Sequence, residues 1–372
     1  MPEKQRHIIH LTSADIWRGA EQQIIYLYQG LSRESVKQII FCSQNSQLLK
    51  YCRENNISTI SYKRNSGANW NLVQALRKYC KTYQPDIIHI HDPHAHNAYV
   101  IAYLMGLRTP AILHRRVDFP TATNYFSAFK YNIHTIRKIV CVSEKVKAVL
   151  YNRINNPERL TVHYDCTDIS AFERINGRQL LEKDYPQLKD KYIIADIAAL
   201  VDHKDHPTFI RTAHYLVHVL NIKEIHFLIM GEGILKKTIH QLLYQYQLEK
   251  YVTMTGFRKD LPALLNGIDT YVFTSKMEGF GSTILQVMSA KVPIVATKTG
   301  GPAEILEHKK TALLASTGDH ISLAHHLLSL KEKHTLKKQL VENAYQLVRQ
   351  FSIEQHVQEI SAIHQQILKQ PK

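Results

Sequence analysis

Short apolar runs rich in β-branched residues alternate with longer amphipathic stretches along most of the chain. In the first half, the runs that predict strands are His7–Leu11, Gln38–Cys42, Ser58–Tyr62, Ile87–His91, Ala111–His114, Ile139–Val142 and Leu160–Tyr164. Between them, stretches such as Ala20–Leu31 and Asn71–Tyr83 carry apolar residues at helical spacing. Strand–helix alternation of this length predicts a parallel sheet with right-handed crossovers.

A second series of the same kind begins at residue 192. Its predicted strands are Tyr192–Ala198, Ile225–Met230, Tyr251–Thr255, Thr270–Thr274, Ile294–Ala296 and Ala312–Leu314. The polar stretch Glu173–Lys191 interrupts the rhythm between the two series. We therefore predict an α/β protein with two Rossmann-like, doubly wound domains, residues 1–170 and 171–350, facing a central cleft. Apolar residues at helical spacing in Ile353–Leu368 predict a closing helix within residues 351–372, which we expect to pack back on the first domain.

The amino-acid composition is that of an ordinary globular protein. Of its 372 residues, 44% are apolar and 21% charged, and no apolar run approaches the roughly 18 residues that a membrane-spanning helix needs. The N-terminus lacks the pattern of a signal peptide. The five cysteines are widely spaced, without a Cys-x-x-Cys pair, which favours buried reduced thiols over disulfides or a zinc site. We expect a cytoplasmic protein, peripheral on the inner face of the membrane if it binds lipid.

The net charge of +15 is uneven. Residues 1–170 contain 22 Lys and Arg against 12 Asp and Glu. Such a basic half attracts anionic partners, which include nucleotide diphosphates and an anionic membrane surface. A generally basic proteome explains the charge equally well. Nucleic acid is disfavoured because no helix-turn-helix, RNP-like or zinc-finger pattern accompanies the charge.

The segment Lys276–Ala290 is the most informative one for function. It predicts a tight turn with Gly279 and Gly281 after a strand, followed by a helix that opens near Ser282. Glycines let the backbone approach a ligand, and a helix N-terminus offers free N–H groups to a diphosphate. Glu278 stands at the edge of this turn, where its carboxylate can accept hydrogen bonds from sugar hydroxyls. The alternative interpretation is purely structural, with the glycines forming the turn and Glu278 starting the helix.

Further motifs flank this segment. They are Arg18-Gly19-Ala20-Glu21 and Val142-Ser143-Glu144 in the first half, and Met230-Gly231-Glu232-Gly233, Gly256-Phe257-Arg258 with Asp260, Asp269 with Ser275, and Thr299-Gly300-Gly301-Pro302-Ala303-Glu304-Ile305 in the second. Together with the turn at Glu278, they resemble in order and spacing the signature of the retaining glycosyltransferases of family 4, which have the GT-B fold. The resemblance extends from about residue 8 to about residue 360.

The resemblance implies a role for each matching position. Glu278 would hold hydroxyls of the donor sugar, and Lys204 would neutralise the diphosphate that leaves, together with helix N-termini and without a bound metal or any other cofactor. The further positions implied in donor binding are Gly279, Phe280, Gly281, Ser282, Thr283, Gln286, Gly231, Arg258, Gly300, Gly301 and Glu304. Arg18 and Gly19 would form a loop near the acceptor and the diphosphate. The second domain would bind the nucleotide sugar and the first domain the acceptor.

The sequence departs from the family pattern at several of these positions. Gln286 replaces a glutamate that holds the ribose hydroxyls in the family, so a hydrogen-bonding side chain remains but its charge is lost. Ala199 replaces an arginine that contacts the diphosphate, and we hypothesise that Arg258 or Arg116 substitutes for it. The glycine of a further family turn is absent from Asp165-Cys166-Thr167-Asp168.

Two histidine-containing segments in the first half follow predicted strands. His89, His91, His94 and His96 have a spacing that invites a metal, but we expect none; Asp92 and His94 are interpreted as part of an exposed loop that faces donor or acceptor, with a structural role as the alternative. In the second segment, either His114 or Arg116 takes the place of the family histidine that contacts the donor sugar. Arg115 and Arg116 side by side can hold a phosphate, or form a solvated turn.

The function that these features predict is transfer of a sugar, with retention, from a UDP- or GDP-sugar to a glycan or lipid-linked acceptor in the synthesis of cell-surface polysaccharide or lipopolysaccharide. Glu278, Lys204, Arg116 and His114 are the predicted catalytic residues. Two alternatives stay open. One is a degenerate accessory protein of the same fold, suggested by Gln286 and Ala199, and the other is a nucleotide-sugar epimerase of the GT-B fold.

Overall fold

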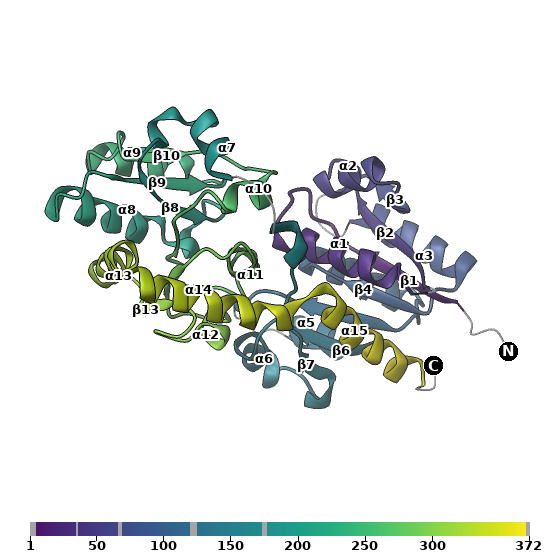
Figure 1. Ribbon diagram of the computed structural model, residues 1–372. Coiled ribbons are helices and arrows are strands. Elements are labelled where there is room, and N and C mark those ends of the chain that lie inside the picture. The colour runs from purple at the N-terminus through teal and green to yellow at the C-terminus, as the bar shows by residue number, and fades with distance from the viewer. Residues whose placement is uncertain (1–4, 35, 66–68, 120–124, 173–176, 370–372) are drawn as a thin grey trace. The chain divides into compact units, whose positions relative to one another are not determined.

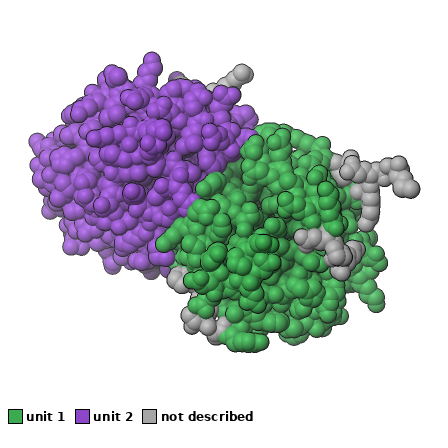
Figure 2. All heavy atoms as spheres, turned by 90° about the horizontal axis from the view of Figure 1, so that it is seen from below, with its two compact units in different colours: residues 1–166, 353–372 green, residues 167–352 purple. Residues whose placement is uncertain are grey.

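The computed structural model describes residues 5–34, 36–65, 69–119, 125–172 and 177–369. The chain forms two compact units, coloured separately in Figure 2: unit 1 comprises residues 1–166 and 353–372, and unit 2 comprises residues 167–352. Both units are Rossmann-like α/β folds built on parallel sheets, as the strand–helix alternation predicts (Figure 1).

Unit 1 contains a seven-stranded sheet in the order β3-β2-β1-β4-β5-β6-β7, in which all pairs are parallel. Its strands are β1 (Arg6–Leu11), β2 (Val36–Ser43), β3 (Thr59–Tyr62), β4 (Ile87–Ile90), β5 (Ala111–Arg115), β6 (Ile136–Cys141) and β7 (Leu160–Val162). Its α-helices are α1 (Gly19–Leu31), α2 (Gln47–Glu54), α3 (Trp70–Tyr83), α4 (Pro93–Leu104), α5 (Tyr125–Asn132), α6 (Glu144–Tyr151) and α15 (Ile353–Leu368). The strand order reverses between β1 and β4, which makes this pair the switch point of the sheet.

Unit 2 contains a six-stranded parallel sheet in the order β10-β9-β8-β11-β12-β13. Its strands are β8 (Tyr192–Ile197), β9 (Ile225–Met230), β10 (Val252–Met254), β11 (Thr270–Phe273), β12 (Ile294–Thr297) and β13 (Leu313–Ala315). Its α-helices are α7 (Gly177–Asp184), α8 (His206–His214), α9 (Lys236–Gln245), α10 (Leu261–Leu265), α11 (Ser282–Ser289), α12 (Pro302–Ile305), α13 (His320–Glu332) and α14 (His334–Val348). Here the switch point lies between β8 and β11.

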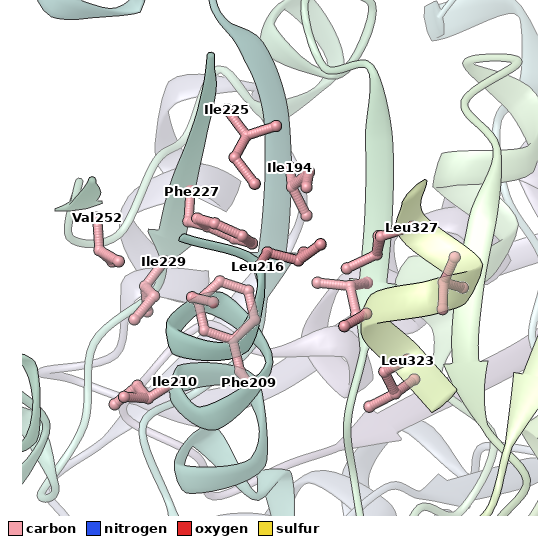
Figure 3. Packing of buried hydrophobic residues seen from close by; sticks show 14 of the residues in the cluster. Ile194, Phe209, Ile210, Leu216, Ile225, Phe227, Ile229, Val252, Leu323 and Leu327 are labelled. Carbon is pink, nitrogen blue, oxygen red and sulfur yellow. The ribbon is translucent and has the colours of Figure 1, made fainter. Parts of the chain in front are cut away.

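Each unit has its own hydrophobic core. In unit 2, buried residues of β8, β9 and β10 pack against α8 and α13; among them Phe209 and Phe227 meet edge to face (Figure 3). In unit 1, one face of the sheet packs against α1 and α15, with Ile8 and Ile112 of the strands against Val357 and Ile360 of the last helix. The closing helix thus belongs to the core of the unit that begins the chain.

The polar segment Glu173–Lys191, which interrupts the rhythm of strands, contains a helix in the part that the structure describes. Residues 173–176 lie outside the described residues, but Gly177 begins helix α7, which is part of unit 2. Gly177 lies so close to the backbone of Gly267 that an added Cβ would sit 2.7 Å from its nitrogen. Leu180 and Leu181 are the only large apolar residues of α7, and only Leu181 is buried, so the helix shows too little apolar sequence to be recognised.

Candidate functional site

The predicted donor residues of unit 2 gather where the loops after β8 and β11 meet. These two strands are neighbours at the switch point of the sheet, and ligands of doubly wound sheets bind outside the carboxyl ends of strands at such a point. Lys204 lies in the loop after β8, and Glu278 lies in the loop after β11. The Nζ of Lys204 donates a hydrogen bond to Oε2 of Glu278, and both side chains are mostly buried, with exposed fractions of 18% and 16%.

Hydrogen bonds to the backbone hold the loops around this ion pair in place. The N–H of Lys276 donates to the carbonyl of His203 at 2.8 Å, and Oγ1 of Thr274 donates to the carbonyl of Lys204 at 3.0 Å. On the other side, the N–H of Gly301 donates to the carbonyl of Glu278 at 3.1 Å. The backbones that carry Lys204 and Glu278 are therefore fixed by the loops themselves, whatever their side chains bind.

Glycines are required where the loop after β12 packs on the Glu278 turn. A Cβ at Gly300, whose φ is +48°, would lie 2.0 Å from the carbonyl oxygen of Glu278, and one at Gly301 would lie 2.2 Å from that of Gly279. Gly281 has φ +77° and precedes helix α11, which begins at Ser282 as predicted. The glycines thus let two loops approach closely, and this places a helix N-terminus beside Glu278.

The other predicted donor residues of unit 2 differ in exposure. Gly279 and Phe280 are buried, Ser282, Thr283 and Gln286 are half-buried, and Glu304 is exposed. Position 231 requires glycine for a structural reason, because a Cβ there would lie 1.9 Å from the carbonyl oxygen of Ala198. Arg258 forms ion pairs with Asp184 and Asp260, and these bonds raise its pKa above the usual range. Arg258 is one of the two arginines, with Arg116, that we hypothesised to replace the arginine missing at Ala199. In the described structure its guanidinium is bound by both carboxylates.

A buried polar cluster close to Lys204 and Glu278 was not predicted from the sequence. Asp196 in β8, His206 at the start of α8 and Tyr271 in β11 are almost completely inaccessible, and the described structure shows no hydrogen-bond partner for Asp196 Oδ2, for either ring nitrogen of His206 or for the Tyr271 hydroxyl. Burial raises the pKa of Asp196 to about 7, partly offset by the charge of Lys204. Burial also lowers the pKa of His206 to about 4, so its ring is neutral at neutral pH. Asp196 Oδ2 and His206 Nε2, which lie 3.3 Å apart, therefore do not form an ion pair there. The only hint in the sequence is an aspartate inside an apolar strand.

In unit 1, the loops after β1 and β4 meet in the same topological position. Asp92 is the N-cap of α4 and accepts hydrogen bonds from the N–H groups of His94 and Ala95. The backbone N–H and the hydroxyl of Ser13 also donate to Asp92, both at 2.6 Å. Asp92 is half-buried and its carboxylate links two loops, whereas His94 is exposed, as predicted. Arg18 and Gly19 are exposed at the start of α1.

In the second histidine-containing segment of unit 1, the two neighbouring arginines have different partners. Arg116 makes an ion pair with Asp165. Arg115 donates instead to the carbonyl of Phe119 at 2.6 Å, so the neighbouring guanidinium groups have different partners. His114 is buried and its Nε2 lies 2.8 Å from Nδ1 of His89. Of the two residues considered for contact with a donor sugar, Arg116 is the more accessible, being half-buried.

Glu21 is a second buried carboxyl of unit 1 that merits notice. It lies in the first turn of α1 and accepts a hydrogen bond from the N–H of Arg18 at 2.8 Å. Burial raises its pKa to about 7, and the nearby charge of Arg116 lowers it slightly. The sequence motif contained Glu21, but nothing in the pattern separated it from an ordinary capping residue.

Comparisons with known proteins agree with the fold and show which family of enzymes the chain resembles. The model of glycosyl transferases group 1 matches residues 178–347, and that of Glycosyltransferase Family 4 matches residues 17–171. The N-acetyl-alpha-D-glucosaminyl L-malate synthase of Bacillus anthracis is 26% identical over 295 residues, which are 77% of this chain and 76% of the relative. The UDP-Gal:alpha-D-GlcNAc-diphosphoundecaprenol alpha-1,3-galactosyltransferase of Escherichia coli is 21% identical over 387 residues, 96% of each chain. The crystal structure of Anabaena HepE in complex with UDP and glucose superposes with a TM-score of 0.84 at 19% identity, covering 97% of this chain and 100% of that one.

Proposed function

The chain belongs to the group 1 glycosyltransferases of family 4, which have the GT-B fold, and we propose that it transfers a sugar with retention from a nucleotide sugar to a glycan or lipid-linked acceptor. Unit 2 binds the donor in this proposal, and unit 1 binds the acceptor. The observation that carries it is the ion pair between Lys204 and Glu278 at the switch point of the unit 2 sheet.

The ion pair suggests how the donor is held. In the free protein the two side chains neutralise each other. When the donor binds, the Lys204 ammonium turns to the diphosphate and the Glu278 carboxylate accepts hydrogen bonds from sugar hydroxyls. Negative charge grows on the diphosphate as it leaves, so Lys204 and the N-terminus of α11 stabilise the transition state more than the ground state. No step in this scheme uses a metal ion at the diphosphate. The acceptor hydroxyl attacks from the face on which the diphosphate departs.

The nucleotide of the donor is proposed to be UDP, with GDP as the second choice. The solved structures of HepE contain UDP, UDP-glucose, or UDP and glucose, which supports a uridine nucleotide. Gln286 in α11 would face the ribose hydroxyls, where its amide offers both a donor and an acceptor.

The test is thermal unfolding of the purified full-length protein with UDP-, GDP-, ADP- and CMP-sugars. A ligand at a hundred times its dissociation constant stabilises the protein by about 2.7 kcal/mol, enough to raise the melting temperature by a few degrees. We expect a UDP-sugar to do so, and Glu278→Ala to remove the shift for the sugar nucleotide more than for UDP alone. Transfer is then followed as release of UDP that depends on an added acceptor.

A degenerate accessory protein is the second candidate, and three positions favour it. Gln286 and Ala199 remove a carboxylate and an arginine from the family pattern, and Arg258 is occupied by Asp184 and Asp260. This alternative predicts that no sugar nucleotide raises the melting temperature. If the chain is an active enzyme, at least one sugar nucleotide raises the melting temperature.

The acceptor is proposed to be a cell-surface glycan precursor, lipid-linked or free, as in polysaccharide or lipopolysaccharide synthesis. The basic first half of the chain and the exposed Tyr125 and Phe126 at the start of α5 fit a surface that docks at an anionic membrane. No helix among the described residues combines the length and hydropathy needed to cross a bilayer. Sedimentation with vesicles of anionic and of neutral lipid tests the docking, which should require anionic lipid and weaken with salt.

A further inference from the structure

Five buried histidines form a polar layer inside unit 1, between the sheet and its last helix. They are His10 in β1, His89 in β4, His91 directly after β4, His114 in β5 and His364 in α15. None is more than 5% exposed. Such a layer is unusual because its positions face the apolar core that α1 and α15 form with the sheet, where an imidazole needs a partner for each nitrogen.

The hydrogen bonds of the layer determine where one free lone pair lies. The amide nitrogen of Gln38 donates to the carbonyl of Tyr28, so its oxygen faces His10 and accepts from Nε2–H of that ring at 3.0 Å. His10 Nδ1 is then an acceptor in the neutral ring, and His91 Nε2, at 3.3 Å, donates to it. This leaves Nδ1 of His91 without a proton. It is buried and has no hydrogen-bond partner in the described structure.

His91 belongs to a group of three histidines with the composition of a metal site. One ring nitrogen each of His89, His91 and His114 lies within 4.8 Å of the corresponding nitrogens of the other two. The ligand nitrogens of a tetrahedral zinc site, with bonds of about 2.0–2.1 Å, are roughly 3.3 Å apart. The 2.8 Å between His89 Nδ1 and His114 Nε2 would have to open slightly. The widest of the three separations is no more than 4.8 Å, so it would have to close by at most about 1.5 Å, which side-chain rotation can supply.

We propose that His89, His91 and His114 bind one divalent transition-metal ion and leave a fourth coordination position for a water molecule. Because all three ligands are imidazoles, we expect the ion to be Zn²⁺. Imidazole suits Zn²⁺ better than Mg²⁺ or Ca²⁺, which prefer oxygen ligands. The site is separate from the residues proposed to bind the donor diphosphate in unit 2. It therefore neither requires nor excludes the proposed transfer reaction, and it stabilises the sheet of unit 1.

The surrounding side chains fit this role. His10 holds the ring of His91, and His364 Nε2 lies 2.7 Å from His89 Nε2, so two of the three ligands have their second nitrogen engaged, as ligating histidines normally do. Arg116, a cation whose charge acts on His91 and His114, forms an ion pair with Asp165.

The direct test uses the full-length wild-type protein, stripped with a chelator and titrated with Zn²⁺ against a chromophoric competitor. We expect one tight site per chain and a higher melting temperature with the metal than without it. Titration with Co²⁺ should give the intense visible bands of a tetrahedral nitrogen site. A wild-type protein without a single tight site, or with only the weak absorption of octahedral Co²⁺, overturns the proposal.

Variants separate the buried site from adventitious binding to the surface, since the chain has 22 histidines. His91→Gln removes the free lone pair and should abolish the tight site together with the Co²⁺ bands. The matched control is His134→Gln, which removes an exposed histidine of unit 1 and should leave both unchanged. Equal binding by the two variants means that the ion binds elsewhere, and the proposal fails. If His91→Gln does not fold, the wild-type stoichiometry and spectrum still decide.

Discussion

In the free protein, the oppositely charged side chains of Lys204 and Glu278 form an ion pair with each other. The pair is mostly buried, so removing one member leaves a poorly solvated charge, and the effect on binding must be separated from the effect on folding. An isosteric change does this best, because it keeps the hydrogen-bonding shape and removes only the charge.

Glu278→Gln should lower kcat/KM for sugar transfer by about 10²–10³-fold, because a neutral amide is a weaker acceptor for the sugar hydroxyls and no longer balances Lys204. The measurement is UDP release in the presence of acceptor. The control, Glu249→Gln, changes an exposed glutamate of unit 2 and should keep wild-type activity. Full activity of Glu278→Gln with a native melting curve would remove this residue from the site.

Gln286→Glu is expected to tighten the binding of UDP about fivefold. The carboxylate restores the charge that the family pattern has at this half-buried position of α11, and hydrogen bonds to a charged acceptor are roughly twice as strong as neutral ones. Isothermal titration with UDP measures the change. UDP binding that weakens or stays the same would show that Gln286 does not face the ribose.

At the level of elements, hydrophobic periodicity was enough to locate the strands, because parallel strands buried on both faces are nearly continuous apolar runs. Helix α11 was also predictable, since Gly281 and the polar Ser282 and Thr283 precede its apolar residues. Helix α7 was not, because its burial depends on a glycine contact with Gly267 that no local pattern reveals.

The site was predictable only where its residues belong to one loop. The turn around Glu278 follows from its own sequence, but its packing against Gly300 joins segments that are distant in the chain. For the same reason the sequence did not show that Asp184 engages Arg258, or that His364 reaches His89 from the last helix. Spacing along the chain carries no information on such contacts.

Gly300→Ala should therefore damage both the stability of unit 2 and the activity. A residue with a Cβ at φ +48° costs roughly 1 kcal/mol, and the contact with the Glu278 carbonyl at 2.0 Å adds a clash with backbone that must move. We expect a loss of about 3 kcal/mol and a fall in kcat/KM of at least tenfold. Urea unfolding and the transfer assay measure the two effects.

The matched control for this prediction is Gly318→Ala. Gly318 also has a left-handed backbone, with φ +81°, but a Cβ there meets no atom within 4 Å. It should cost only the conformational strain and leave activity intact. Equal effects of the two alanine variants would show that strain, and not the packing of the loop on Glu278, decides the requirement for glycine.

On the scale of the whole molecule, the buried titratable groups act together on stability. Histidines of both units are held neutral by burial, and the pKa is lowered to about 4 for His10 and His226 and to about 3 for His364. Because these groups take up protons at pH 6.5 only when the chain unfolds, they make stability fall as the pH drops through 6.5. Glu21 and Asp196 act in the opposite direction, since their raised pKa values of about 7 favour the folded, protonated form in acid.

The histidines outnumber the two carboxyls, so the free energy of unfolding should decrease between pH 8 and pH 5.5. Each buried histidine contributes roughly 1.4 kcal/mol to that decrease, and each carboxyl offsets about 2 kcal/mol. Urea unfolding in the presence of a chelator, at several pH values, gives the slope of the free energy of unfolding against pH. This slope is about 1.4 kcal/mol per pH unit for each proton taken up on unfolding. His364→Gln should reduce this uptake by about one proton near pH 5.5, whereas His240→Gln, at an exposed position, should not change it. Comparing slopes excludes any pH-independent change that the substitution makes in the free energy of unfolding. An unchanged slope in His364→Gln would therefore mean that this histidine is already charged in the folded protein.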